Sequence, residues 1–194
     1  MTSRFASVVG RRLLGLQRSK LLRDERGATA VEFGLLALPF FMIVGAILET
    51  AVVFLSGQIL DTAVQDVSRL IRTGQVREMG ITTAQDFKDR VCERLYGLFT
   101  NCDALHVEVD VQDTGRFSDI TISAPIDFAN CKKDACDWTR PEVFSAGQGS
   151  SIVVVQVYYK WPAIVSLGGY HLGNLGDGTR LMSGTTVLRN EPFT

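Results

Sequence analysis

The sequence predicts an α+β protein in which a long amino-terminal transmembrane helix is followed by a small exported domain with a second helix and an antiparallel sheet. Three observations lead to this class. An apolar run lies near the start of the chain, helical spacing of apolar residues continues past it, and strand-like alternation follows downstream. We expect three parts: a basic cytoplasmic leader (1–27), a transmembrane and extended helix (28–73) and the exported domain (74–194).

The apolar run covers residues 33–57, which are 25 residues with Glu49 as their only ionisable side chain. A hydrocarbon core of ~30 Å needs ~20 helical residues, so the run is long enough to span a bilayer. A buried helix of a soluble domain would usually be shorter and carry a polar stripe. A secretory signal peptide would have an apolar core of only ~7 to 15 residues. The run therefore predicts one membrane span.

Charge predicts the orientation of this span. Residues 1–26 have a net charge of +5, whereas the rest of the chain has a net charge of −6. Arginine and lysine next to a span stay on the cytoplasmic side, so we expect a cytoplasmic amino terminus and an exported carboxyl-terminal part. The acidic exported part has no broad basic surface, which argues against nucleic-acid binding.

The helical pattern continues beyond the span as far as Arg72, and Thr73 and Gly74 then supply a stop. The apolar residues that recur at intervals of three and four are Ile59, Leu60, Ala63, Val64, Val67, Leu70 and Ile71. The spacing thus predicts one helix over residues 28–72, roughly 65 Å long at ~1.5 Å per residue. Its second half would stand clear of the membrane and present an apolar stripe to the exported domain.

The downstream half predicts one more helix and several strands. Thr82 or Thr83 could cap a helix whose apolar face contains Phe87, Val91, Leu95 and Leu98. Alternation or apolar runs predict strands at 105–112, 119–123, 151–161 and 183–190. On the first strand, His106 and Glu108 would lie on the solvent face. The long connections 125–150 and 162–180 are candidate contact surfaces, the second because it is rich in glycine.

All four cysteines, Cys92, Cys102, Cys131 and Cys136, lie in the part predicted to be exported. An even number of cysteines in an oxidising compartment predicts disulfides. Three pairings are possible. Cys92 to Cys102 and Cys131 to Cys136 are favoured, because the first would join a helix end to a strand start and the second would close a long loop. A four-cysteine zinc site is the alternative, but the close C-x2-C spacing typical of such sites is missing.

Catalytic motifs are not found. The sequence has no GxSxG, HExxH or phosphate-binding glycine loop, and its only histidines, His106 and His171, are expected at the surface. We therefore expect no enzyme activity, no cofactor and no metal.

The most specific pattern lies at the head of the predicted span. Gly27 ends a charged run and precedes small residues, which leaves extended backbone that a protease could bind. Glu32 lies near the apolar core, where an unpaired carboxylate costs ~2 kcal/mol or more. A cut after Gly27 would create an ammonium group on Ala28 of a neighbouring chain, with which Glu32 could pair.

Glu49 is a second acidic group close to the membrane. It lies seventeen residues after Glu32, near the far face of a ~30 Å core. It either reaches the outer interface or pairs with a partner helix inside the membrane.

The stretch RGATAVEFGLLALPFFMIVGAILE resembles the class III signal of type IVb (Flp-type) prepilins and pseudopilins. Such signals are cut after a glycine and carry glutamate at mature position five, followed by an aromatic residue. Gly27, Ala28, Glu32 and Phe33 match that spacing. The pilin-like helix, the small domain and a closing strand such as TTVLRNEPF resemble the TadE family of pilus-assembly pseudopilins. The domain at 74–194 is larger than expected of the major Flp pilin, which favours a minor role.

The resemblance implies a pseudopilin in adhesion-related pilus assembly, cut after Gly27 by a prepilin peptidase, with Glu32 and Phe33 as docking residues. The implied partners are that peptidase, a TadF-like sister pseudopilin, the major Flp pilin, inner-membrane platform proteins and membrane lipid. The implied location is the bacterial inner membrane, with a periplasmic carboxyl-terminal domain and pilus association after processing. The alternative is a membrane-tethered periplasmic binding or sensing module whose anchor helix is not processed.

Overall fold

The computed structural model describes residues 27–113, 115–133, 136–164, 166–167 and 170–193. The predicted leader therefore lies outside the described residues, except for Gly27. Helix α2 (Ala28–Arg72) is continuous through Pro39, as the spacing predicts. Packing divides the chain within this helix, into one unit of residues 1–46 and another of residues 47–194.

The second unit contains a four-stranded sheet with the order β2-β1-β3-β6. Its strands are β1 (His106–Gln112), β2 (Val143–Phe144), β3 (Ile152–Pro162) and β6 (Thr179–Arg189). β3 is antiparallel to both β1 and β6, with Val109 opposite Val155 and Val157 opposite Gly184. β2 runs parallel to β1, so the sheet is mixed rather than purely antiparallel. The class is α+β, as predicted.

Short helices connect α2 to the sheet. They are α3 (Gln75–Glu78), α4 (Ala84–Glu93) and the 3-10 turn η2 (Cys102–Ala104). Gly74 ends the long helix with a φ of 75°, which glycine adopts without strain. Thr83 caps α4 in a capping box: its hydroxyl accepts from the Asp86 amide at 3.1 Å, and the Asp86 carboxylate accepts from the Thr83 amide at 2.9 Å.

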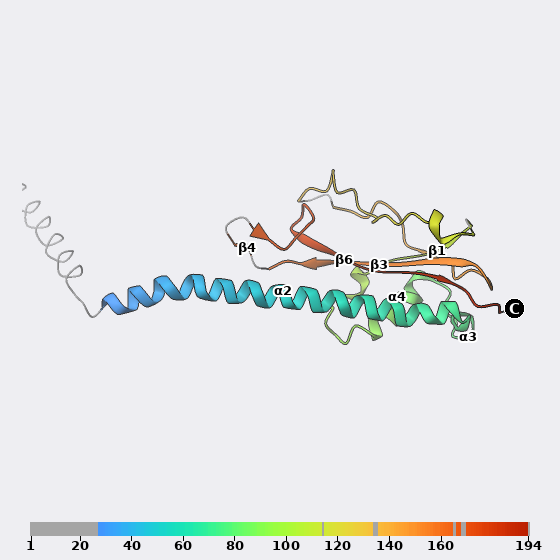
Figure 1. Ribbon diagram of the computed structural model, residues 1–194, viewed down its shortest axis with the longest axis horizontal. Coiled ribbons are helices and arrows are strands. Elements are labelled where there is room, and N and C mark those ends of the chain that lie inside the picture. The colour runs from blue at the N-terminus through green and yellow to red at the C-terminus, as the bar shows by residue number, and fades with distance from the viewer. Residues whose placement is uncertain (1–26, 114, 134–135, 165, 168–169, 194) are drawn as a thin grey trace, which may run out of the picture. The chain divides into compact units, whose positions relative to one another are not determined.

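The hydrophobic core lies between one face of the sheet and the helices. From α2 it includes Leu60, Ala63, Val64, Val67 and Ile71, which are the residues of the predicted stripe that are fully buried. From the sheet it includes Val107, Val109, Val153, Val155 and Val157. Figure 1 shows α2 along this face and the chain between β1 and β2 across the other face. Both faces of β1 are therefore covered.

Gly184 brings α2 close to β6. A Cβ atom at this position would lie 2.8 Å from Val64 Cγ2 and 3.2 Å from the Leu60 carbonyl oxygen. Since both distances are shorter than an ordinary van der Waals contact, only glycine fits here without movement of the helix or the strand.

Three predicted elements differ in the structure. Residues 119–123, all of them described, form no strand, and the segment instead begins with the 3-10 turn η3 (Phe117–Asp119). The α4 helix ends at Glu93, earlier than its apolar pattern suggests, and Tyr96 and Gly97 follow with positive φ. The glycine-rich connection contains a hairpin of β4 (Ser166–Leu167) and β5 (Tyr170–His171).

Candidate functional site

The predicted processing site lies where α2 begins. Gly27 is exposed and directly precedes Ala28, the first residue of the helix. Among the described residues, none lies within 4 Å of where a Cβ atom on Gly27 would be. Packing within the described part of the chain therefore does not require glycine at this position.

Glu32 and Phe33 are exposed on the second turn of α2, and Phe33 retains 70% of its accessible surface. Within the part of the chain that the structure describes, the Glu32 carboxylate has no hydrogen bond and no ion pair. An exposed carboxylate on an otherwise apolar helix surface is able to pair with a cation of another chain.

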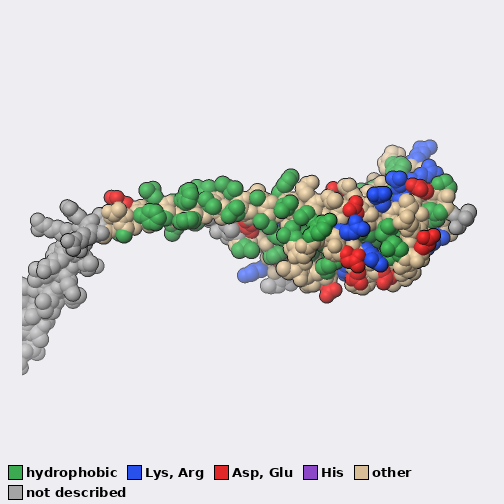
Figure 2. Space-filling model, turned by 90° about the horizontal axis from the view of Figure 1, so that it is seen from below, with side chains coloured by type: hydrophobic (Ala, Val, Ile, Leu, Met, Phe, Trp, Pro, Cys, Tyr) green, Lys and Arg blue, Asp and Glu red, His purple; other side chains and the backbone are tan. Residues whose placement is uncertain are grey.

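The apolar part of α2 is long enough to cross a membrane, and little of it is buried. Exposed large hydrophobic residues occur along it from Val31 to Leu55. Figure 2 shows these hydrophobic side chains along the helix, whereas charged side chains gather over the carboxyl-terminal domain. A core helix of a soluble domain would bury such residues, so the exposure favours a membrane span.

Glu49 lies on α2 and belongs to the second unit. Its Oε1 atom accepts a hydrogen bond of 2.6 Å from the backbone amide of Ile164, just after the end of β3. The carboxylate is thus engaged within the chain itself.

A cluster of polar side chains that the sequence did not predict lies under the connection between β1 and β2. At its centre is Glu108, whose side chain is only 8% exposed. Arg140 donates to both carboxylate oxygens, from Nε at 3.0 Å and from Nη2 at 2.7 Å. Arg140 also donates to the Ser123 hydroxyl at 2.9 Å and to its carbonyl oxygen at 2.7 Å. The ion pair therefore fastens the connection to β1, and the bonds to Ser123 join two parts of the connection to each other.

His106 is buried in this cluster, at 3% exposure, and so its prediction as a surface residue is wrong. Its Nε2 atom lies 3.2 Å from Glu108 Oε1, and its ring stacks on Trp138 with a centroid distance of 4.4 Å. Glu108 is also buried, contrary to the prediction. The alternation on β1 is present as predicted, but the face expected to meet solvent is covered by the connection between β1 and β2, through residues such as Trp138 and Arg140. The side chain of His171 lies outside the described residues.

Tyr158 completes the cluster from β3. Its hydroxyl donates to Gln156 Oε1 at 2.7 Å. Burial, together with the Glu108 carboxylate, raises the pKa of Tyr158 to about 12, although Arg140 acts in the opposite direction. The hydrogen bond to Glu108 likewise raises the pKa of Arg140. Tyr158 is therefore neutral and Arg140 is charged at neutral pH, as suits a structural network.

A hollow of about 340 Å³ lies beside this cluster, lined by Glu108, Asp110, Thr121, Ser123, Arg140 and Gln156 among others. The Glu108 carboxylate is occupied by Arg140 and His106, so it is poorly placed to act as a general base. Among the described residues, no group of three or more His, Cys, Asp and Glu side chains could hold a metal ion.

The four cysteines lie in two pairs at disulfide-bonding distance, Cys92 with Cys102 and Cys131 with Cys136. The Cα atoms are 5.9 Å and 4.4 Å apart, respectively, within the range of protein disulfides. The first pair joins α4 to η2, just before β1. The pairing in the native protein stays a prediction that non-reducing peptide mapping would test.

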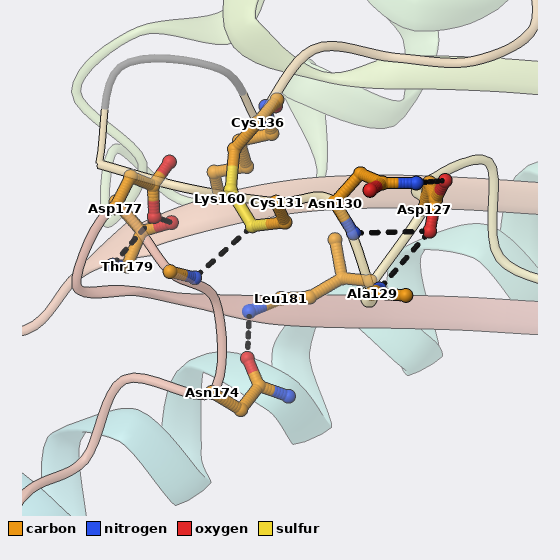
Figure 3. Close-up of a disulfide and its surroundings, with 11 residues drawn as sticks. Asp127, Ala129, Asn130, Cys131, Cys136, Lys160, Asn174, Asp177, Thr179 and Leu181 are labelled. Atoms are coloured by element: carbon orange, nitrogen blue, oxygen red, sulfur yellow. Dashed lines mark hydrogen bonds between the residues drawn. A yellow bond between two sulfur atoms is a disulfide. The ribbon is translucent and has the colours of Figure 1, made fainter.

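The second pair also holds the loop before β6, as Figure 3 shows. The Gly176 amide donates to Cys131 Sγ at 3.0 Å, and a Cβ atom on Gly176 would overlap the Cys131 carbonyl. Asp127 organises the nearby turn by accepting hydrogen bonds from the amides of Ala129 and Asn130 and from the Asn130 side chain. These hydrogen bonds, led by the one from the Asn130 side chain, lower the pKa of Asp127.

Comparison with known proteins finds a similarity in the amino-terminal part of the chain. Residues 27–69 match the family model of TadE-like proteins, which confirms the resemblance over this segment. The match begins at Gly27 and includes Ala28, Glu32, Phe33 and Glu49. Neither the search of curated proteins nor the search of solved structures gave a match. The family match suggests a role in Tad pilus assembly, in which TadE-like proteins are structural or assembly components rather than enzymes.

Proposed function

Because residues 27–69 are TadE-like, we propose that this chain is a minor pseudopilin in the assembly of a type IVb (Flp/Tad) pilus. A prepilin peptidase removes residues 1–27 in the cytoplasm-facing part of the membrane, and the mature chain begins at Ala28. The observation that carries the proposal is the coincidence of two boundaries: the family match begins at Gly27 and the long helix begins at Ala28.

The geometry of the helix head supports a role in assembly. Glu32 and Phe33 are exposed and lie four and five residues after Ala28. The ammonium group created at Ala28 by cleavage would be a suitable partner for Glu32 of an adjacent chain, since a carboxylate near hydrocarbon is stabilised by a cation. This pairing would fix how far one helix is shifted along its neighbour. The neighbour would be a sister pseudopilin, the major pilin or both.

The folded domain after the helix favours a minor component over a bulk fibre subunit. Its sheet, two cysteine pairs and the polar cluster around Glu108 form a compact unit of residues 47–194 together with the second half of α2. The proposed location is the bacterial inner membrane, with the domain in the periplasm and with contacts to the inner-membrane platform. Export is supported by the position of the paired cysteines, which suit an oxidising compartment.

Complementation of a strain that lacks this chain tests the function. Gly27→Val should leave an uncut precursor and no pili, because the branched side chain obstructs the peptidase. The matched control is Gly45→Val, which makes the same change inside the helix, where a Cβ atom also meets nothing within 4 Å. This control should be processed normally. Glu32→Ala should be processed but should fail to restore pili. Normal processing of Gly27→Val would contradict the proposal.

A second candidate is a membrane-tethered periplasmic binding or sensing module, favoured by the hollow beside Arg140. Against it, the guanidinium group of Arg140 is already engaged by Glu108 and Ser123. The same complementation separates the two candidates. A binding module predicts an intact precursor and normal pili after deletion of the gene.

A further inference from the structure

The turn that follows β3 carries an exposed apolar side chain. Ile164 is 85% exposed, more than any of the other large hydrophobic residues that are exposed in the described structure. Its backbone amide is held by the Glu49 carboxylate at 2.6 Å. The end of β3 thus lies against the middle of α2 at Glu49, in agreement with Figure 1.

Glu49 lies within the apolar part of α2 and not beyond it. Exposed hydrophobic residues continue on both sides of it, at Ile47 and Leu48 before it and at Val52, Phe54 and Leu55 after it. From Glu49 to Leu55 the helix advances about 9 Å. The turn at Ile164 is therefore level with residues whose exposed apolar surface would face lipid.

The sequence around this turn has no permanently charged side chain. From Trp161 to Gly176 there is no Asp, Glu, Lys or Arg. A charged protein partner would find no complementary charge in this stretch. An apolar surface continuous with a membrane span is instead suited to lipid.

The hydrogen bond to Glu49 meets a specific requirement of such a site. A backbone amide exposed to hydrocarbon without a partner costs several kcal/mol, which is why irregular backbone is rare at membrane depth. Pro162 has no amide hydrogen, and Glu49 accepts from Ile164. The carboxylate therefore satisfies the Ile164 amide, which would otherwise lack a partner at the edge of the bilayer.

We propose that the turn at Ala163–Ile164 inserts into the lipid leaflet on the side of the carboxyl-terminal domain, with Glu49 as the residue that holds it there. The folded domain would then contact the membrane at a second point, in addition to the helix itself. The inference requires the membrane span but does not depend on a role in pilus assembly.

The test places a fluorescent label at single positions of the full chain, reconstituted in vesicles of phosphatidylethanolamine and phosphatidylglycerol. Ile164→Cys carries the label, and Ile122→Cys is the matched control, because Ile122 is also an exposed isoleucine of the domain. Lipids with a nitroxide near the headgroup should quench the label at 164 and shift its emission to the blue. The label at 122 should remain unquenched.

Equal exposure of both labels to water would overturn the proposal. The proposal would also be overturned if the label at 164 is shielded from water but is not quenched by the lipid nitroxide, and position 164 cross-links to another copy of the chain.

The role of Glu49 is tested in the same vesicles. Glu49→Ala should reduce quenching at 164, whereas Glu49→Gln retains an acceptor oxygen and should preserve it. A label on Val52→Cys reports insertion of the helix and should stay quenched in both variants. Undiminished quenching at 164 in Glu49→Ala would show that Glu49 does not hold the turn.

Discussion

Glu108 shows how a single buried charge organises the domain. Its carboxylate accepts two hydrogen bonds from Arg140, whose side chain is 42% exposed, and lies beside the buried His106. We expect Arg140→Ala to lower the free energy of unfolding by about 2 kcal/mol, because it leaves a buried carboxylate without its cation. Urea unfolding in detergent, followed by the fluorescence of Trp138 and Trp161, measures this change.

The control for this prediction is Arg90→Ala. Arg90 forms an exposed ion pair with Glu93 on α4, and such pairs contribute ~0 to 1 kcal/mol. Glu108→Gln in the Arg140→Ala background should recover part of the loss. Equal effects of the two arginine substitutions would mean that the buried pair is not important for stability.

The Asp86 carboxylate stabilises the fold by an amount that depends on pH. The hydrogen bond from the Thr83 side chain, followed by those from the amides of Thr82 and Thr83, lowers the pKa of Asp86 from 3.8. A carboxylate whose pKa is lower in the folded state stabilises the fold above the unfolded pKa, and this stabilisation is lost as pH falls through the folded value.

Asp86→Asn should therefore weaken the fold at neutral pH and reduce the loss of stability below pH 3.8. Asp89→Asn is the control, since the Asp89 carboxylate accepts a hydrogen bond from the Gln85 side chain on the exposed face of α4. Acid titrations of unfolding for both variants provide the measurement. An unchanged acid dependence in Asp86→Asn would contradict the assignment.

Among the elements, the contact between α2 and β6 is the most tightly constrained. Gly184→Ala should lower the free energy of unfolding by ~1 to 3 kcal/mol, because the new Cβ atom would lie 2.8 Å from Val64 Cγ2. Ser183→Ala is the control, as the neighbouring Ser183 is exposed. Val64→Ala combined with Gly184→Ala should cost less than the sum of the two single changes. Strict additivity would argue against the close packing.

The elements with a strong periodic pattern could be predicted from the sequence, and the others could not. The apolar residues from Ile59 to Ile71 predict α2 because their spacing places them all on one face of a helix. The alternation on β1 predicts a strand in the same way. Residues 119–123 also alternate, but they lie in a connection held to the sheet by side chains such as Arg140 and not by a ladder. β2 has only two residues and therefore leaves no pattern.

The candidate sites differ in the same way. The signal around Gly27 and Glu32 is local in the sequence, so its spacing could be recognised directly, and the family match covers it. The Glu108 cluster joins residues 32 positions apart, and Glu49 meets Ile164 across 115 positions. No local pattern contains such contacts. The sequence shows only a Glu between two valines at this position, which does not indicate the distant Arg140 as its partner.

For the whole molecule, the central claim is that one helix has two successive environments. In the proposed function, the membrane part of the helix is processed at Ala28 and packs against other pilins through its apolar surface. From Ile47 onward, the same helix belongs to a folded unit whose core it completes at Leu60, Val64 and Val67. The domain would thus be carried wherever the processed helix is carried.

The mass of the amino terminus in the native membrane tests this claim most directly. The chain is isolated from a strain with its prepilin peptidase and from one without it, and the amino-terminal peptides are compared by mass spectrometry. Our account predicts a chain that begins at Ala28 in the first strain and one that retains the leader in the second. A mature chain that begins elsewhere, or an intact leader in both strains, would contradict it.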